Sequence, residues 1–317
     1  MVKEDLRKKI LCFAYKEGFQ KEGKSLDKCL NIKKSTADYI LEKLKEEKYY
    51  TEIRYEINFG AVGLGKFAWL FISVNWDAFL FEEFVEKVLK MPQISVVADV
   101  TGEYDIALKI FGPSIQNISS FVMGFEKLFE HVIVDTKIYF ASKEYKRHYL
   151  KTDKTIPIKL SNIDYQIICE KNAKPELTSF EISEKLGVHR NTVSTKWKSY
   201  WGNNVLLKKT IALTQKGYDL TDLGLKAFII LKPCPGKVEE VAKRLEKIEE
   251  IQDLFTTLSN DIILVVRVPN SEDLAYFYKA FSKVEGSIRE TNTIIFLTKH
   301  SKSSLTLKEL GTIIDVG

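Results

Sequence analysis

The segment GVHRNTVSTKWKSYW, residues 187–201, contains side chains that can bind the base edges and the backbone of a DNA duplex. It carries three Lys or Arg residues and no acid. Arg and Asn can each form two hydrogen bonds to one base, guanine and adenine respectively, whereas Ser, Thr and Lys more often contact phosphates. The residues expected to face outward are His189, Arg190, Asn191, Thr192, Ser194, Thr195 and Lys198. The chemistry predicted here is therefore the noncovalent recognition of double-stranded DNA.

A second segment of the same kind begins at Lys33. Its candidate DNA-binding residues are Lys33, Lys34, Ser35, Thr36 and Tyr39. Glu42, Glu46 and Glu47 follow them, and this acidic far end disfavours close contact with phosphates. Both segments start with a poor helix N-cap, Lys33 or His189, where Ser or Thr is usual. One hypothesis is that each of these two residues touches DNA, and the other is that the helix start frays slightly.

Helical periodicity places each segment on the second helix of a helix-turn-helix. Around the later segment, Ile182 anchors a first helix, Gly187 supplies a left-handed turn residue, and Val193 holds the second helix against the core. In the earlier copy Asn31 occupies the turn, where its tolerance of left-handed geometry suits it. Such a three-helix unit can also serve only packing or dimerisation, and this interpretation stays open beside DNA binding.

The chain repeats itself at an offset of 156 to 159 residues. Residues 26–44 align with 182–200, 62–74 with 221–233, and 93–112 with 251–270, the last pair with one residue lost in a turn. The copies share the pattern of apolar and polar residues, with low identity. The polar, basic stretch KTDKTIPIKL, which contains a proline, marks the boundary between the two units.

Each unit changes from helical to β periodicity part-way along its length. In the first unit, strand-like segments alternate with helices near 78–90 and 114–129 in the order β-α-β-β-α-β. The second unit repeats this order with helices near 236–248 and 271–283. The predicted fold class is α+β, with two winged helix-turn-helix domains, 1–60 and 151–215, each followed by a ferredoxin-like βαββαβ domain, 61–150 and 216–317.

Composition is that of an ordinary globular protein, with 45% hydrophobic and 29% charged residues and a net charge of +5. The positive charge is clustered, since residues 1–51 have 13 Lys or Arg against 9 Asp or Glu, and residues 141–210 have 14 against 7. Such clustering suits a polyanionic partner, although it can also serve solubility. With no apolar run long enough for a membrane span, no signal-peptide core and widely spaced cysteines, we expect a cytoplasmic protein without disulfides.

The helix-turn-helix, a short β-arm ending in Leu-Gly, and βαββαβ with Thr-Gly-x-Tyr-Asp in the central turn together resemble the Lrp/AsnC "feast/famine" regulators. The resemblance covers roughly residues 3–146 and 161–300, and its most specific motif is DVTGEYDIALKI at 99–110. It implies that each ferredoxin-like part is a regulatory (RAM) domain, and that the protein assembles through these domains and senses an amino acid or a related metabolite. Carried over by position, the candidate effector-binding residues are Val100, Thr101, Gly102, Tyr104 and Asp105.

The same turn has a chemistry of its own. Gly102 can expose backbone N–H groups to a carboxylate, and Asp105 can accept from an ammonium group, although the motif can equally be no more than a good hairpin turn. The chain departs from the family in carrying both units, and its second copy has LSND at 258–261 in place of the motif, so no effector pocket is expected there. We predict an intramolecular pseudo-dimer with its two sheets face to face, which binds an asymmetric DNA site, and a homo-oligomer of such tandem chains.

Catalytic motifs are missing from the sequence. The histidines, His131, His148, His189 and His300, fall at a strand start, a tail, a recognition helix and a strand end, with no pair at metal-ligand spacing. We therefore predict no enzyme activity, no cofactor and no metal. Two alternatives remain open: an enzyme similar to the siroheme decarboxylases, which resemble Lrp/AsnC proteins and occur as paired or fused units, and a metabolite-sensing or assembly protein that does not bind DNA.

Overall fold

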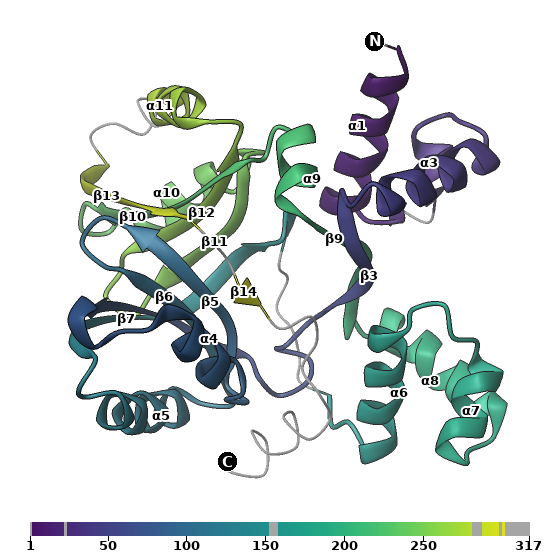
Figure 1. Cartoon of the computed structure of the whole chain (residues 1–317), viewed down its shortest axis with the longest axis horizontal. Coiled ribbons are helices and arrows are strands. Elements are labelled where there is room, and N and C mark those ends of the chain that lie inside the picture. The colour runs from purple at the N-terminus through teal and green to yellow at the C-terminus, as the bar shows by residue number, and fades with distance from the viewer. Residues whose placement is uncertain (1, 22–23, 152–157, 281–286, 298–299, 302–317) are drawn as a thin grey trace.

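The computed structural model describes residues 2–21, 24–151, 158–280, 287–297 and 300–301. It has a mixed α+β structure in which the chain runs twice through a similar order of elements, three helices followed by a sheet with covering helices (Figure 1). The last expected domain ends at residue 317, and its residues 302–317 lie outside the described part, as do residues 281–283 of an expected helix.

The elements of the two copies follow one another in the same way. The first copy contains α1 (Val2–Lys16), β1 (Gln20–Lys21), β2 (Lys24–Ser25), α2 (Leu26–Cys29), α3 (Lys34–Glu46), β3 (Tyr50–Ile57), β4 (Lys66–Val74), the 3-10 helix η1 (Trp76–Ala78), α4 (Phe81–Leu89), β5 (Ile94–Thr101), β6 (Ile106–Gly112), α5 (Ile115–Leu128), β7 (Ile133–Arg147) and β8 (Leu150–Lys151). The second copy contains α6 (Asn162–Ala173), α7 (Ser179–Leu186), α8 (Arg190–Gly202), β9 (Leu206–Leu213), α9 (Gln215–Leu220), β10 (Leu225–Pro233), α10 (Val238–Leu245), β11 (Ile251–Thr257), β12 (Ile262–Val268), α11 (Ser271–Ala280), β13 (Ile288–Phe296) and β14 (His300–Ser301).

Each copy folds its last four long strands into an antiparallel sheet of ferredoxin-like order. The strands lie as β5-β6-β4-β7 in the first copy and as β11-β12-β10-β13 in the second. In both sheets the first and third strands of the βαββαβ unit are central, and the second and fourth lie at the edges. The predicted ferredoxin-like fold is therefore confirmed in both copies.

The two sheets join at both edges. Strand β13 pairs with β5, where Ile295 lies opposite Thr101, and β11 pairs with β7, where Thr257 lies opposite Ala141. The strands of both copies thus close into one ring, which leaves no open edge among these eight strands. The predicted pseudo-dimer with its sheets face to face is confirmed, and a buried apolar core lies between the two inner faces.

The central strands are covered on both faces, which explains why most of their residues are apolar. In β4 the even-numbered residues from Ala68 to Val74 pack in the core beneath α4 and α5. The odd-numbered Phe67, Trp69 and Phe71 point the other way, into the core between the sheets. Because successive side chains of a strand alternate between its faces, one aromatic-rich strand supplies two separate cores.

The two three-helix units lie on one side of the sheets and are joined by paired arms (Figure 1). Strand β3 of the first copy pairs with β9 of the second, from Tyr50 opposite Leu213 to Ile57 opposite Leu206. Each arm completes the core of the other copy, since Ile211 packs among α1–α3 whereas Tyr55 packs among α6–α8. The positions of the two units relative to each other are thus fixed by backbone pairing as well as by side chains.

Candidate functional site

The helix α8 follows α7 through a tight turn. Thr178 caps α7 in a capping box with Glu181. Gly187 ends α7 with φ +63° and ψ 33°, the left-handed conformation that the sequence predicts. The chain then enters α8 at Arg190, so the residues predicted to contact DNA occupy the first turns of this helix.

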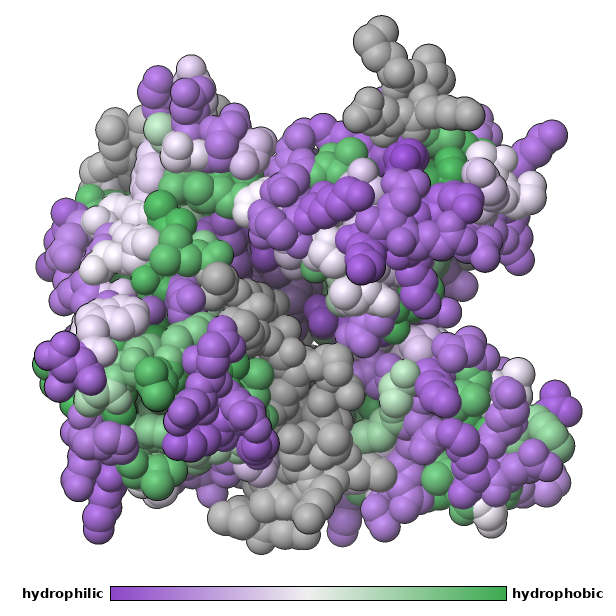
Figure 2. Space-filling model, viewed as in Figure 1, coloured by the Kyte–Doolittle hydropathy of each residue, from purple (hydrophilic) through white to green (hydrophobic). Residues whose placement is uncertain are grey.

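The predicted outward face of α8 is open. His189, Arg190, Asn191, Thr192, Thr195 and Lys198 are exposed, and Ser194 is half-buried. On the opposite side Val193 and Tyr200 are buried, and Trp197 packs against the same core. Hydrophilic side chains cover most of the visible face of both three-helix units (Figure 2). This face of α8 is accessible to a partner and carries no acidic residue.

The two N-caps differ from each other. Lys33 makes no side-chain capping hydrogen bond, as expected for a poor cap. At α8, however, the Nδ1 atom of His189 accepts a hydrogen bond from the backbone N–H of Asn191 at 3.2 Å. The prediction that His189 leaves its helix uncapped is therefore wrong, because an imidazole nitrogen can replace the usual hydroxyl. The cap uses only Nδ1, and the Nε2 atom of this exposed ring takes no part in it.

The helix α3 presents a smaller polar face. Lys33, Lys34, Ser35 and Tyr39 are exposed and Thr36 is half-buried. Tyr39 is 60% exposed, which is unusual for an aromatic ring. At the far end Glu42, Glu46 and Glu47 are exposed, and Glu46 pairs with Lys43 at 2.6 Å. Lys43 and Lys45 at the far end stand beside these three acids, so a net positive charge is left only at the start of α3.

A buried carboxylate fixes α8 on its own unit. Asp164 of α6 accepts hydrogen bonds from Nζ of Lys196 at 2.6 Å and from the Tyr200 hydroxyl at 2.7 Å, both on α8. It also accepts from the backbone N–H of Ser161 at 2.7 Å. Burial opposes ionisation, but these hydrogen bonds outweigh it and lower the pKa of Asp164 to about 2. This anchor could not be predicted from the sequence, because Asp164 has the pattern of an ordinary residue of the first helical turn.

The turn predicted to bind an effector lies at a seam between the two sheets. Val100 pairs with Phe296 and Thr101 with Ile295, both on β13. Gly102 has φ +119°, a conformation that favours glycine, and is exposed together with Thr101. Tyr104 is buried instead, with its ring 5.7 Å from that of Phe71 in the core between the sheets.

Asp105 has a structural task in this turn. Its Oδ2 atom accepts a hydrogen bond from the backbone N–H of Val74 at 2.9 Å, and its own N–H donates to the carbonyl of Ile72 at 2.9 Å. These bonds tie the turn to β4. The sequence predicts that the Asp105 carboxylate accepts from an ammonium group of a ligand. One of its two oxygens, however, already accepts from the main chain. In the second copy the turn is shorter and self-bonded, with Ser259 Oγ donating to Asp261 at 2.7 Å.

His148 corrects a further expectation. It does not lie in a tail but directly after β7, with φ +46° and a side chain that is 24% exposed. In the imidazole ring, Nδ1 lies 3.0 Å from the side-chain amide nitrogen of Gln252 and Nε2 lies 3.8 Å from a carboxylate oxygen of Glu56. The backbone N–H of His148 donates a hydrogen bond to the carboxylate of Asp253 at 2.8 Å. Burial lowers the pKa of His148 to about 4. His131, by contrast, is exposed as expected.

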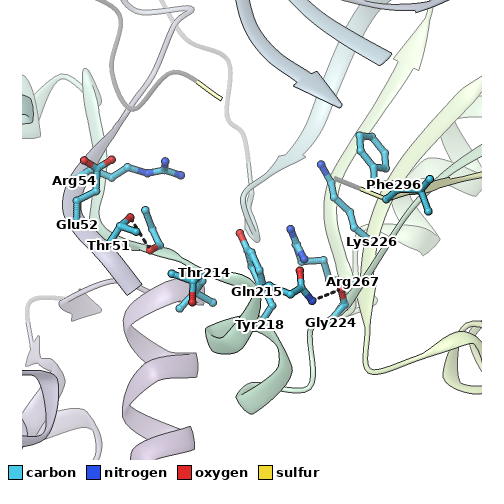
Figure 3. A pocket seen from close by; sticks show the side chains of 13 residues that line it. Thr51, Glu52, Arg54, Thr214, Gln215, Tyr218, Gly224, Lys226, Arg267 and Phe296 are labelled. Carbon is cyan, nitrogen blue, oxygen red and sulfur yellow. Dashed lines mark hydrogen bonds between the residues drawn. The ribbon is translucent and has the colours of Figure 1, made fainter. Parts of the chain in front are cut away.

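A cavity of about 580 Å³ lies between the paired arms and the second sheet. Figure 3 shows Glu52 and Arg54 of β3 on one wall, Tyr218 of α9 at the base, and Lys226 and Arg267 of the second sheet on the opposite wall. Sequence reasoning did not single out any of these residues, because segments far apart in the chain build the cavity.

Within the described ranges, no group of three or more His, Cys, Asp or Glu side chains could hold a metal ion. No helix in those ranges is long and apolar enough to cross a membrane.

The two ferredoxin-like halves decide the family. Residues 70–150 and 226–306, half of the chain, match the Lrp/AsnC ligand binding domain. The chain belongs to the Lrp/AsnC family. This Lrp/AsnC protein is 31% identical over 150 residues to the HTH-type transcriptional regulator FL11 of Pyrococcus abyssi, a match that covers 46% of this chain and 95% of that protein. The regulator of the same name from Pyrococcus furiosus is also 31% identical over 150 residues, covering 46% and 94%.

Among solved structures, the siroheme decarboxylase NirDL is similar over the full length of this Lrp/AsnC protein. The match covers 98% of this chain and 99% of that chain, with a TM-score of 0.60 and 13% sequence identity. Its complex with an iron-uroporphyrin III analogue gives a TM-score of 0.57 at 12% identity, covering 92% of each chain. At such low identity the likeness shows the fold alone.

Proposed function

We propose that this protein is a transcriptional regulator that binds double-stranded DNA through two helix-turn-helix modules, α1–α3 and α6–α8, with β3 and β9 as their wings. The relatives that match one copy of the chain are named as regulators of this type. The proposed domains are 1–60 and 151–215 for DNA binding, and 61–150 and 216–317 for regulation.

The observation that carries this proposal is the open face of α8. Arg190 and Asn191 stand exposed at the start of the helix, where a recognition helix meets base edges. Thr195 and Lys198 continue the same exposed face and suit phosphate contacts. Because Lys196 and Tyr200 are bonded to Asp164, the helix is held in place from behind. Such a preorganised polar face lowers the entropy lost on binding.

The helix α3 is the second, weaker DNA-binding element of the proposal. Lys33, Lys34 and Ser35 would contact the backbone near the first turn, with Tyr39 beside them. The glutamates at the far end of α3 would keep that end away from phosphates. The regulator would therefore bind its two half-sites unequally.

Two finer parts of the proposal concern regulation. The exposed backbone at Thr101 and Gly102 is the proposed effector site, and its ligand is an amino acid or a related metabolite. Asp105 would contribute only the carboxylate oxygen that the main chain leaves unused. The proposed assembly is a dimer of tandem chains in which each chain already forms one pseudo-dimer.

Fluorescence anisotropy with duplexes enriched by selection from a random library tests DNA binding. For a regulator the dissociation constant should rise by about 10³-fold or more when salt rises from about 50 to about 200 mM. Arg190→Ala should weaken binding by about 1–3 kcal/mol. The matched control is Arg244→Ala, because Arg244 is exposed on α10 and pairs with Glu240, far from the proposed face. If no duplex is enriched from the random library, the proposed function as a DNA-binding regulator is wrong.

A decarboxylase is the second candidate, and the match to NirDL over the full chain favours it. The test adds siroheme to the purified protein and follows the absorption of the tetrapyrrole and the release of carbon dioxide. A protein that binds and decarboxylates the tetrapyrrole but ignores duplex DNA would replace the regulator with an enzyme. If it binds neither ligand, the remaining interpretation is an assembly or sensing protein.

A further inference from the structure

Two buried cations face each other in the second sheet. Lys226 of β10 lies directly opposite Arg267 of β12, and the two are 8% and 5% exposed. Both alternate with residues of the outer core and therefore point inward, on the same side as Phe228 and Val265 of the core between the sheets. Like charges directly opposite on neighbouring strands are destabilising, and burial adds a desolvation cost.

The first copy has no such pair. The strand positions that correspond to Lys226 and Arg267 are held by Phe67 and Phe111, which also lie directly opposite each other. Their rings pack in the core between the sheets, with Phe67 5.0 Å from the ring of Phe255. The second copy thus has two cations at the positions where the first copy, with the same fold, has two packed aromatic rings.

The surroundings of the cations form one end of the cavity between the arms and the second sheet. Nζ of Lys226 lies 4.0 Å from the ring centre of Phe296, and the guanidinium of Arg267 lies 3.6 Å above the ring of Tyr218. Arg267 donates one hydrogen bond to the carbonyl of Leu223, but its buried Nε has no hydrogen-bond partner. The two cations are largely removed from water, and an anion in the cavity would offset this desolvation cost.

Acidic groups near the cavity offset part of its positive charge. Arg54 on the opposite wall pairs with Glu56 at 3.3 Å, and Glu52 is the only acid among the described residues that line the cavity. Lys226 also interacts electrostatically with Asp253. Arg54 and Lys226 are thus partly offset by Glu56 and Asp253, whereas Arg267 forms no salt bridge with any acid of the described residues.

We propose that this cavity binds a small organic anion, with a carboxylate or phosphate group held by Lys226 and Arg267 and an apolar part lying against Tyr218 and Phe296. Its volume of about 580 Å³ is in the range of pockets for small molecules, about 300–1,000 Å³. The site is distinct from the turn at Gly102. Because β3 and the second sheet form opposite walls, the ligand bridges the paired arms and the regulatory sheet. The proposal does not depend on DNA binding.

Thermal unfolding of the full chain tests the site, with citrate and inorganic phosphate as probes at constant ionic strength. We expect a saturable rise in Tm of about 2 °C or more with at least one probe. A response to citrate alone assigns a carboxylate ligand, and a response to phosphate alone assigns a phosphate ligand. Both salts also stabilise proteins in general, so the measured quantity is the difference between wild type and variant.

Lys226→Met should lose the saturable part of the Tm rise, because it removes one cation and keeps an unbranched side chain only one atom shorter. Lys232→Met is the matched control, since Lys232 lies on the same strand, is exposed and pairs with Glu290 outside the cavity. If Lys226→Met does not fold by circular dichroism, Arg267→Met makes the same test, because it removes the other cation that would hold the anionic group. No saturable rise with either probe, or an equal rise in wild type and the folded cavity variant, overturns the proposal.

Discussion

Ile53 of β3 lies opposite Ile211 of β9 in the antiparallel pairing that joins the arm of the first copy to the arm of the second. The same pairing runs along the whole of both arms. Ile211 in turn packs in the core of the first three-helix unit. The two units are therefore held at one spacing by a single chain, and their exposed helix faces are not identical.

The first prediction concerns the shape of the DNA site. Because α3 and α8 present different side chains at a fixed spacing, selection from random duplexes should give two unlike half-sites. Arg190→Ala should relax base preference in one half-site only, at a loss of about 1–3 kcal/mol. Lys34→Ala should weaken binding to all sequences and lower the salt slope by about one. Recovery of perfect inverted repeats would contradict the asymmetric pseudo-dimer.

The second prediction concerns the anchor behind α8. Asp164→Asn should lower the free energy of unfolding of the second three-helix unit by about 2–4 kcal/mol, because it leaves Lys196 near the protein interior without its carboxylate. Urea unfolding followed by tryptophan fluorescence measures this loss, since Trp197 belongs to that unit. The control is Asp5→Asn, an exposed partner of Lys9, which should change stability by less than about 1 kcal/mol. An equal effect of both substitutions would remove the anchoring role.

The fold could be predicted because its signals are local. Strand β4 reads as a continuous apolar run, and its alternate residues turned out to supply the two cores on either side of it. The turn at Gly187 could be predicted for the same reason, since a glycine between two helical segments specifies a left-handed residue without reference to the rest of the chain.

The parts that could not be predicted depend on distant contacts. Lys208 of β9 looks like a solvent-facing lysine in LLKKTIAL, yet it is 4% exposed. Its Nζ donates to the carbonyls of Tyr15, Lys16 and His148, which only the folded chain brings together. Burial lowers the pKa of Lys208 to about 8. The inner cations Lys226 and Arg267 were hidden in the same way, because charge in a sequence is usually a sign of exposure.

The third prediction compares two glycines. A Cβ atom on Gly217 of α9 would lie 2.0 Å from the carbonyl oxygen of Tyr49 in the first copy, so that backbone must move. Gly217→Ala should therefore destabilise the protein by about 1–3 kcal/mol. On Gly124 of α5 the same atom meets nothing within 4 Å, and Gly124→Ala should stabilise by about 0.5–1 kcal/mol through helix propensity. Thermal unfolding of the two variants should shift Tm in opposite directions, and a shared direction would contradict the close approach of α9 to the first unit.

The fourth prediction concerns pH. Folded His148 has a pKa of about 4 because it is buried, whereas the unfolded chain has the ordinary value of 6.5. Between these values the unfolded chain binds a proton that the folded protein does not, so stability falls as pH decreases from 6.5 to 4, by up to about 3 kcal/mol. The carboxylates of Glu56 and Asp253 face the ring and favour its charged form, whereas Lys208 and Lys109 oppose it.

His148→Asn tests this pH dependence, because asparagine tolerates the positive φ at this position. Urea unfolding at pH values between 4 and 7 should show a flatter stability curve for the variant than for wild type. His131→Asn is the matched control, since His131 is exposed and its loss should leave the curve unchanged. Asp164 acts mainly below pH 4, because its lowered pKa makes its stabilisation disappear only as pH falls through about 3.8 to 2. If the free energy of unfolding changes with pH equally in wild type and His148→Asn, groups other than the His148 imidazole determine the pH dependence between pH 4 and 7.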